Sequence, residues 1–127
     1  MDAQVKGTLA VDLDGTILRM NLARWHREGM DYFGTPMPGV KKALKVLREL
    51  GLRIVIHTCR MNPMVATGHT LPEMKKTIED ALDELNIPYD EVYDGVGKPL
   101  ADFYIDDRGI KFKTWSQVLY DLGVIKE

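Results

Sequence analysis

The chain has 127 residues, with 17 Lys and Arg against 19 Asp and Glu, a formal net charge of -2 and 45% hydrophobic residues. These values are typical of one globular domain, so we expect a single domain over residues 1–127. They argue against a general nucleic-acid coat or a polybasic membrane patch. The lone Cys59 and the absence of a signal-peptide pattern or a membrane-length apolar stretch favour a cytoplasmic protein with no membrane partner.

Four short apolar segments are predicted to form buried strands. Thr8–Val11, Arg53–His57 and Ala101–Ile105 are rich in apolar and β-branched residues, and Val92–Tyr93 is a weaker candidate.

Apolar residues at helical spacing predict three helices between and after these strands. One lies between Gly39 and Gly51, one begins at the capping box Thr70–Glu73, and the last covers Thr114–Gly123. Strands that alternate with helices predict an α/β fold. We expect a single three-layer, Rossmann-like domain whose mainly parallel central sheet has helices on both faces.

Residues 18–37, which we call the flap, lack a clear period and contain several Gly and Pro residues. Because the flap follows the first strand, we expect it over the carboxyl end of the sheet, where open α/β folds bind ligands. Arg24, Trp25 and Arg27 are its candidates for substrate specificity, as an aromatic and cationic surface. The alternative is a surface helix with Trp25 packed inward.

Acidic and polar residues follow three of the predicted strands. Asp12-Leu13-Asp14-Gly15-Thr16 follows the first, Thr58-Cys59-Arg60 the second and Asp106-Asp107 the last, with Lys98 just before the last strand. Parallel strands place their carboxyl ends on one edge of the sheet, so these side chains are expected to converge. Clustered carboxylates repel one another unless a cation lies among them, and oxygen ligands suit Mg²⁺. The pattern predicts metal-assisted phosphoryl chemistry.

These residues, in this order, resemble the four motifs of the haloacid dehalogenase superfamily, and the resemblance spans essentially the whole chain. Asp12-Leu13-Asp14-Gly15-Thr16 resembles the first motif, Thr58 the second, Lys98 the third and Asp106-Asp107 the fourth. The resemblance implies a small phosphatase without a cap domain, because the segments between the motifs are too short for one.

The resemblance also implies a role for each matched residue. Asp12 would be the nucleophile that attacks phosphorus, and Asp14 the general acid and then the general base. Thr58 and Lys98 would bind the phosphoryl group. The magnesium ligands would be Asp12, Asp14, Asp106 and Asp107, and which residue of the last pair contacts the metal directly stays open.

Asp14 narrows the choice within the superfamily. Members that cleave carbon–halogen bonds lack a carboxylate at this position, and cation-pumping ATPases carry Thr there. Arg60 is grouped with the phosphate-binding residues, and an ion pair with one of the aspartates is its alternative. We therefore expect a Mg²⁺-dependent phosphomonoester hydrolase that works through an aspartyl-phosphate.

Two other functions remain open at this point. The substrate could be a nucleotide or a polynucleotide 3′ end, which an uncapped site, Trp25 and Asp106-Asp107-Arg108 favour. A non-catalytic binding module with the same fold is the less favoured alternative. An uncapped site also fits closure by a second copy of the chain, as a homo-oligomer.

Overall fold

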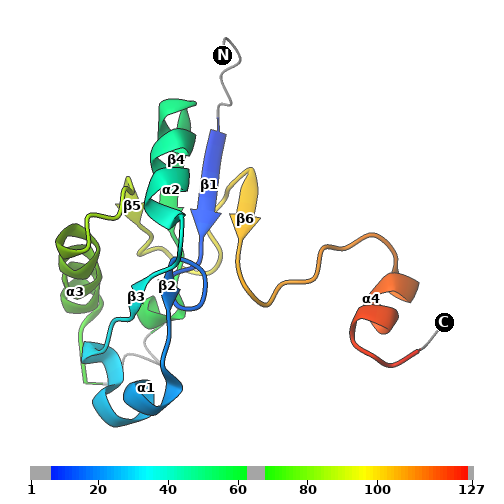
Figure 1. Ribbon diagram of the computed structural model, residues 1–127, viewed down its shortest axis with the longest axis horizontal. Helices are drawn as coiled ribbons and strands as arrows, with labels where there is room; N and C mark the ends of the chain where they lie inside the picture. The colour runs from blue at the N-terminus through cyan, green and yellow to red at the C-terminus, as the bar shows by residue number, and fades with distance from the viewer. Residues whose placement is uncertain (1–6, 63–67, 126–127) are drawn as a thin grey trace.

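The computed structural model describes residues 7–62 and 68–125, which form an α/β fold around a parallel sheet (Figure 1). The strands of this sheet lie in the order β5-β4-β1-β6. Their bounds are Gly7–Val11 for β1, Leu52–Ile56 for β4, Glu91–Val92 for β5 and Phe103–Ile105 for β6. The α-helices that follow the flap are α2 (Val40–Glu49), α3 (Leu71–Glu84) and the shorter α4 (Trp115–Asp121). The predicted α/β class with its parallel sheet is confirmed.

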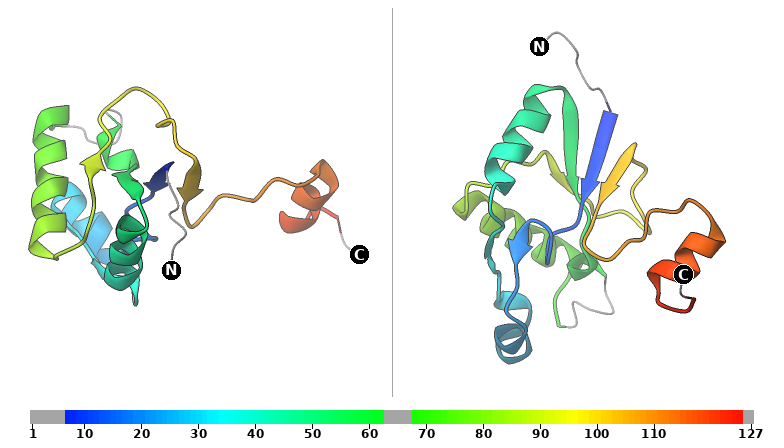
Figure 2. Two further views of the ribbon diagram at one scale, coloured as in Figure 1. Left: turned by 90° about the horizontal axis from the view of Figure 1, so that it is seen from above. Right: turned by 45° about the vertical axis from the view of Figure 1, so that its right-hand side comes forward.

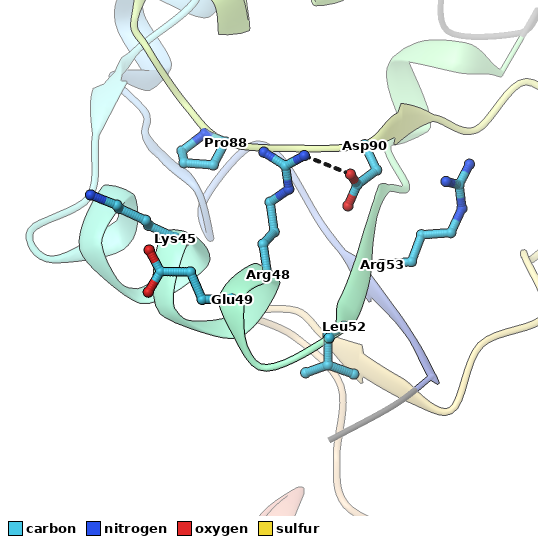
Figure 3. A pocket seen from close by; sticks show the side chains of 8 residues that line it. Lys45, Arg48, Glu49, Leu52, Arg53, Pro88 and Asp90 are labelled. Atoms are coloured by element: carbon cyan, nitrogen blue, oxygen red, sulfur yellow. Dashed lines mark hydrogen bonds and ion pairs between the residues drawn. The ribbon is translucent and has the colours of Figure 1, made fainter. Parts of the chain in front are cut away.

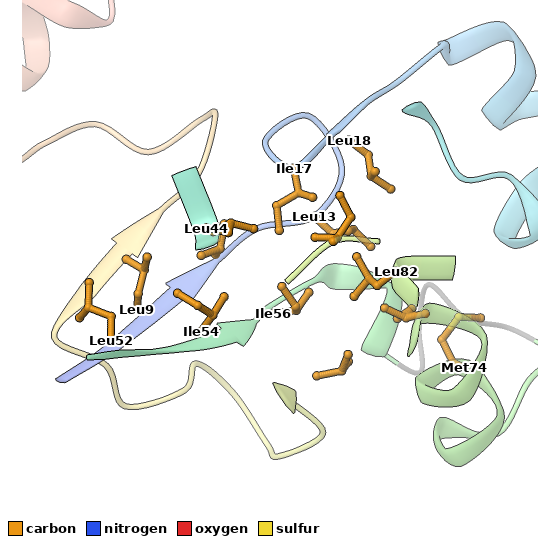
Figure 4. Close-up of a cluster of buried hydrophobic side chains, with 14 residues drawn as sticks. Leu9, Leu13, Ile17, Leu18, Leu44, Leu52, Ile54, Ile56, Met74 and Leu82 are labelled. Atoms are coloured by element: carbon orange, nitrogen blue, oxygen red, sulfur yellow. The ribbon is translucent and has the colours of Figure 1, made fainter. Parts of the chain in front are cut away.

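The core lies on one face of the sheet. Leu9 and Val11 of β1 are in register with Ile54 and Ile56 of β4, and paired residues of parallel strands point to the same face. Helices α2 and α3 pack here, because their buried side chains join the same apolar cluster (Figure 4): Leu44, Met74, Ile78 and Leu82. Burial of these residues stabilises the fold by about 1.5–3 kcal/mol for each large apolar side chain.

The opposite face is covered differently. Ala10 and Val55 point to it and are only 2% and 4% exposed. The connection 93–102 crosses this face and is held to β6 by Tyr104, whose hydroxyl donates to the Pro99 carbonyl at 2.6 Å and accepts from the Ala101 N–H at 3.2 Å. Both helices with buried residues in the described parts of the chain thus lie on the first face, where we expected helices on both.

The chain after β6 lies apart from the rest of the molecule (Figures 1 and 2). Residues 106–114 contain no helix or strand, and α4 follows them with no buried residue. Trp115 is 73% exposed and Phe103 51% exposed. The helix itself was predicted correctly, since Thr114 caps it by accepting from the Gln117 N–H at 3.1 Å.

The flap is a small hairpin rather than an irregular loop. Strands β2 (Leu18–Arg19) and β3 (Thr35–Pro36) pair antiparallel and carry helix α1 (Leu22–Glu28) and a 3-10 turn, η1 (Gly29–Asp31). The hairpin lies at the end of the sheet to which β1 points (Figure 1). The flap therefore lies at the carboxyl end of the sheet, as the sequence predicted. Within the described residues, no helix is long and apolar enough to cross a membrane.

Candidate active site

A pocket opens at the carboxyl edge of the sheet, on the face that the connection 93–102 crosses. It has a volume of about 840 Å³, within the usual range for small-molecule sites. Residues from three strand ends and the β5–β6 connection line it, and these include Asp12, Thr58, Lys98 and Asp106. The structure thus brings together one residue from each of the four sequence motifs.

The loop after β1 holds Asp12 at the pocket and turns sharply behind it. The N–H groups of Ile17 and Leu18 both donate to the Leu13 carbonyl, at 3.0 and 2.9 Å. Gly15 has a φ of +90°, a conformation that favours glycine, and the carboxylate of Asp107 lies against its Cα. A Cβ at position 15 would meet this carboxylate, which can rotate away, so the positive φ is the stronger reason for glycine at this turn.

Asp12 lies in the electrostatic field of the other site carboxylates. Its pKa is raised from 3.8 to about 6, first by burial and then by the charges of Asp107, Asp14 and Asp106, against a hydrogen bond from the Leu13 backbone. The Thr16 hydroxyl lies 3.5 Å from the Asp12 carboxylate and is positioned to donate to it. A concentration of negative charge of this kind favours a bound cation.

The two aspartates after β6 have different surroundings. Asp106 lines the pocket and accepts hydrogen bonds from the backbone N–H groups of Gly109 and Arg108, which lower its pKa, with a smaller contribution from the charge of Lys98. Asp107 instead faces Gly15. Among the described residues no group of three or more acidic, His or Cys side chains forms a ready metal cluster. Asp12, Asp106 and Asp107 nevertheless offer carboxylate oxygens at this edge of the sheet, the type of ligand that Mg²⁺ prefers.

Thr58 and Lys98 contribute the hydrogen-bond donors of the pocket. The Thr58 oxygen accepts from the Arg60 N–H at 3.1 Å, which leaves its own hydroxyl hydrogen for a ligand. The Lys98 ammonium lies 3.8 Å from the centroid of the Tyr104 ring. The pKa of His57 on the pocket wall is lowered, first by burial of the imidazole and then by the positive charge of Lys98.

Arg60 does not occupy the phosphate-binding position expected for it. Its side chain is fully buried, and its Nε and Nη2 groups donate to the two oxygens of Asp14, at 2.8 and 3.0 Å. The grouping of Arg60 with Thr58 and Lys98 is therefore corrected, since a buried guanidinium with its donors engaged is not presented to the pocket. The alternative, an ion pair with a site aspartate, is what the structure contains.

The flap residues proposed for specificity do not line this pocket in the part of the chain that is described. Arg24 donates to both oxygens of Glu28, at 2.7 and 3.2 Å, and stacks on Tyr32. Trp25 stacks on the Arg60 guanidinium, 4.6 Å from the ring centroid. Arg27 is exposed and lies 3.9 Å from Glu28. The inward packing of Trp25, given above as the alternative, is thus observed.

Three aromatic residues of the pocket wall were not singled out from the sequence. His57, Tyr93 and Tyr104 all line the pocket, and the His57 and Tyr93 rings meet edge to face at 6.3 Å between centroids. His57 directly follows β4, Tyr93 directly follows β5, and Tyr104 is the middle residue of β6. Strand alternation was the available signal, since it places Tyr104 opposite in direction to Phe103 and Ile105.

A second pocket, of about 540 Å³, lies at the other end of β4 and does not share these properties (Figure 3). Both of its arginines are already paired: Arg48 donates to Asp90 at 2.8 Å, and Arg53 donates to Glu91 at 2.7 Å. The carboxyl-edge pocket is therefore the candidate active site.

Comparison with known proteins finds two similar chains among the solved structures. No family model and no curated protein matches it. A crystal structure of a target protein from Vibrio cholerae is 35% identical, with a TM-score of 0.51 over 84% of both chains. The chain belongs to the family of this Vibrio cholerae protein. The conserved protein coded by a locus from Bacteroides thetaiotaomicron is 21% identical, with a TM-score of 0.54 over 97% of this chain and 94% of that chain. That second likeness shows the shared fold.

Proposed function

We propose that the protein is a Mg²⁺-dependent phosphomonoester hydrolase that works through an aspartyl-phosphate. The observation that carries this proposal is the pocket lined by Asp12, Thr58, Lys98 and Asp106. It combines a carboxylate nucleophile, two donors for phosphoryl oxygens and a further carboxylate for a cation. The resemblance of the same residues to the haloacid dehalogenase motifs supports this chemistry independently.

In the first step, an Asp12 carboxylate oxygen attacks phosphorus and the bond from phosphorus to the alcohol oxygen breaks. For this step Asp14 must be protonated, on an oxygen released from Arg60, and it gives that proton to the leaving alcohol. In the second step, water attacks the phosphorus of the aspartyl-phosphate and gives a proton to Asp14, while the bond from phosphorus to the Asp12 oxygen breaks, which frees the Asp12 carboxylate and releases inorganic phosphate. Thr58 and Lys98 donate hydrogen bonds to the phosphoryl oxygens, whose negative charge persists throughout.

The cation would be held by the carboxylates of Asp12 and Asp106, with Asp107 and the Asp14 backbone carbonyl as further oxygen ligands. Bound Mg²⁺ would supply charge neutralisation between the nucleophile and the phosphoryl group. Asp106 is the better candidate for direct contact, because it lines the pocket with Asp12 while Asp107 faces Gly15.

The proposal also includes a class of substrate, a partner and a cellular location. A phosphorylated small molecule fits a pocket of about 840 Å³. A nucleotide or polynucleotide 3′ end is the second candidate, but it loses one argument because Trp25 packs on Arg60. A cytoplasmic location and a homo-oligomer that closes the open pocket remain parts of the proposal.

The direct test is hydrolysis of p-nitrophenyl phosphate with Mg²⁺ and with EDTA, followed by a panel of sugar phosphates, nucleotides and 3′-phosphorylated oligonucleotides. We expect Mg²⁺-dependent turnover and an acid-stable phosphoprotein after rapid quenching. Asp12→Asn should lose both signals, whereas Asp80→Asn on the exposed face of α3 should keep them. Absence of turnover on every substrate, with the fold intact, would favour the non-catalytic binding module.

A further inference from the structure

Arg60 is a buried charge at the junction of three segments of the chain. It belongs to the 3-10 turn η2 (Cys59–Met61) that follows β4, and its side chain has no exposed area. On one side, its guanidinium donates hydrogen bonds to both carboxylate oxygens of Asp14, at 2.8 and 3.0 Å. This forked arrangement fixes the plane of the carboxylate as well as its distance.

The other side of the guanidinium contacts the flap. Nη1 donates to the Met30 carbonyl at 3.0 Å, and Nη2 donates to the Tyr32 carbonyl at 2.6 Å. Its plane also stacks on the rings of Phe33 and Trp25, at 4.1 and 4.6 Å from their centroids. The flap is thus attached to the acidic loop through one side chain.

Burial makes these contacts interdependent. A guanidinium removed from water is stable only while its charge is compensated and its donors are used. If the Asp14 carboxylate is lost or moves, the charge of the buried Arg60 is no longer compensated. Its hydrogen bonds to the Met30 and Tyr32 carbonyls of the flap are then disturbed as well. Lysine cannot replace it, because an ammonium has no planar fork and cannot reach acceptors on opposite sides at once.

We propose that Arg60 is a positioning residue that holds the Asp14 carboxylate and attaches it to the flap, so that the two are ordered together. The role of Asp14 as proton donor rests on the proposed function, but the coupling between Asp14 and the flap does not. In this arrangement Trp25 acts on the site through Arg60 and not through contact with the substrate.

The coupling can be measured without any activity, by amide hydrogen exchange of the flap. We expect Asp14→Ala and Arg60→Lys to raise exchange in residues 25–33 by about tenfold or more, relative to the buried amides of α3. Asp12→Ala is the matched control from the same acidic loop, and Arg53→Lys the matched control for a paired arginine at the other end of β4. Both should leave flap exchange unchanged. Unchanged flap exchange in Asp14→Ala would overturn the proposal, whether or not the protein is a phosphatase.

A double-variant experiment separates positioning from general destabilisation. With an alkyl phosphate, which needs a proton donor, Arg60→Lys should lower kcat by about 10²-fold or more while changing KM little. In the Asp14→Asn background the same substitution should cost almost nothing, because the residue it positions is already inactive. Equal losses in both backgrounds would make Arg60 a purely structural residue and overturn its positioning role. If wild-type protein has no activity, the proposed function fails and flap exchange alone decides the coupling.

Discussion

The candidate active site joins two regions of different packing. Asp12, Asp14 and Thr58 follow β1 and β4, whose inward side chains are almost fully buried, with Ile56 at 0% exposure. Asp106 and Asp107 follow β6, where Ile105 is 43% exposed. Both Ile56 and Ile105 are in register with the same residue, Val11. β4 lies between β1 and β5, whereas β6 is an edge strand, so the difference reflects both the place of each strand in the sheet and what covers it.

This contrast teaches that the two regions contribute to the site in different ways. On the packed side, a functional residue also takes part in buried contacts, as the pair of Asp14 and Arg60 shows. On the exposed side, Lys98 and Asp106 make local contacts, with the Tyr104 ring and with the backbone of Arg108 and Gly109. Substitutions on the packed side should change stability and activity together, whereas those on the exposed side should change activity alone.

The largest expected effect is on the nucleophile of the packed side. Asp12→Asn removes the attacking oxygen's charge with almost no change in volume, so turnover should fall on the order of 10⁴-fold or more. Steady-state kinetics with Mg²⁺ and a circular dichroism spectrum check the prediction. A folded variant with wild-type rates would remove the covalent step from the mechanism.

The packing difference itself can be tested with one substitution at two positions. Ile56→Ala deletes fully buried atoms and should lower the free energy of unfolding by about 2–5 kcal/mol. Ile105→Ala, on the other neighbour of Val11, should cost about 1 kcal/mol or less because its side chain is already half in water. Urea unfolding followed by tryptophan fluorescence measures both. Equal costs would mean that β6 is covered in solution, by α4 or by a second copy.

Metal binding is expected to depend on the exposed side. Saturating Mg²⁺ should stabilise the native state by about 2.7 kcal/mol at a hundredfold excess over Kd. Asp106→Ala should abolish this stabilisation, and its cost to the metal-free protein should be limited to the exposed hydrogen bonds from Arg108 and Gly109. Thermal melting with and without Mg²⁺ distinguishes the cases, and an undiminished response in the variant would place the metal elsewhere.

The smallest expected effect is the pH dependence due to Asp12 in the metal-free protein. Its pKa is raised from 3.8 to about 6, so the folded state binds more protons than the unfolded state between these values. The contribution of Asp12 to stability is therefore present at low pH and lost as pH rises through about 6. In EDTA, Asp12→Asn should gain melting temperature relative to wild type between about pH 4 and pH 7. A constant difference across this range would contradict the raised pKa.

Local features of the fold could be predicted from the sequence, and long-range ones could not. The capping box of α3 is present as expected, with Glu73 N–H donating to Thr70 at 3.2 Å and Thr70 N–H donating to Glu73 at 3.0 Å. The strand ends that carry Asp12, Thr58 and Asp106 were also located, because each follows a short apolar run.

The partner of Arg60 was harder to predict, because Asp14 lies far from it in the sequence and either a phosphate or a carboxylate satisfies a guanidinium equally well. The flap hairpin was missed because β2 and β3 have two residues each, too few to show alternation. The exposed position of α4 could not be foreseen either, since an amphipathic helix predicts burial but not the surface that provides it.

The glycine at the centre of the acidic loop has a consequence for how the sequence can vary. Gly15 has a backbone conformation that disfavours other residues, and the carboxylate of Asp107 occupies the space of its missing side chain. Alanine at this position would therefore destabilise the fold even in a protein without catalytic activity. The glycine of this motif is constrained by the backbone conformation of its turn, so tolerance to mutation at position 15 reports on the local fold and not on catalysis.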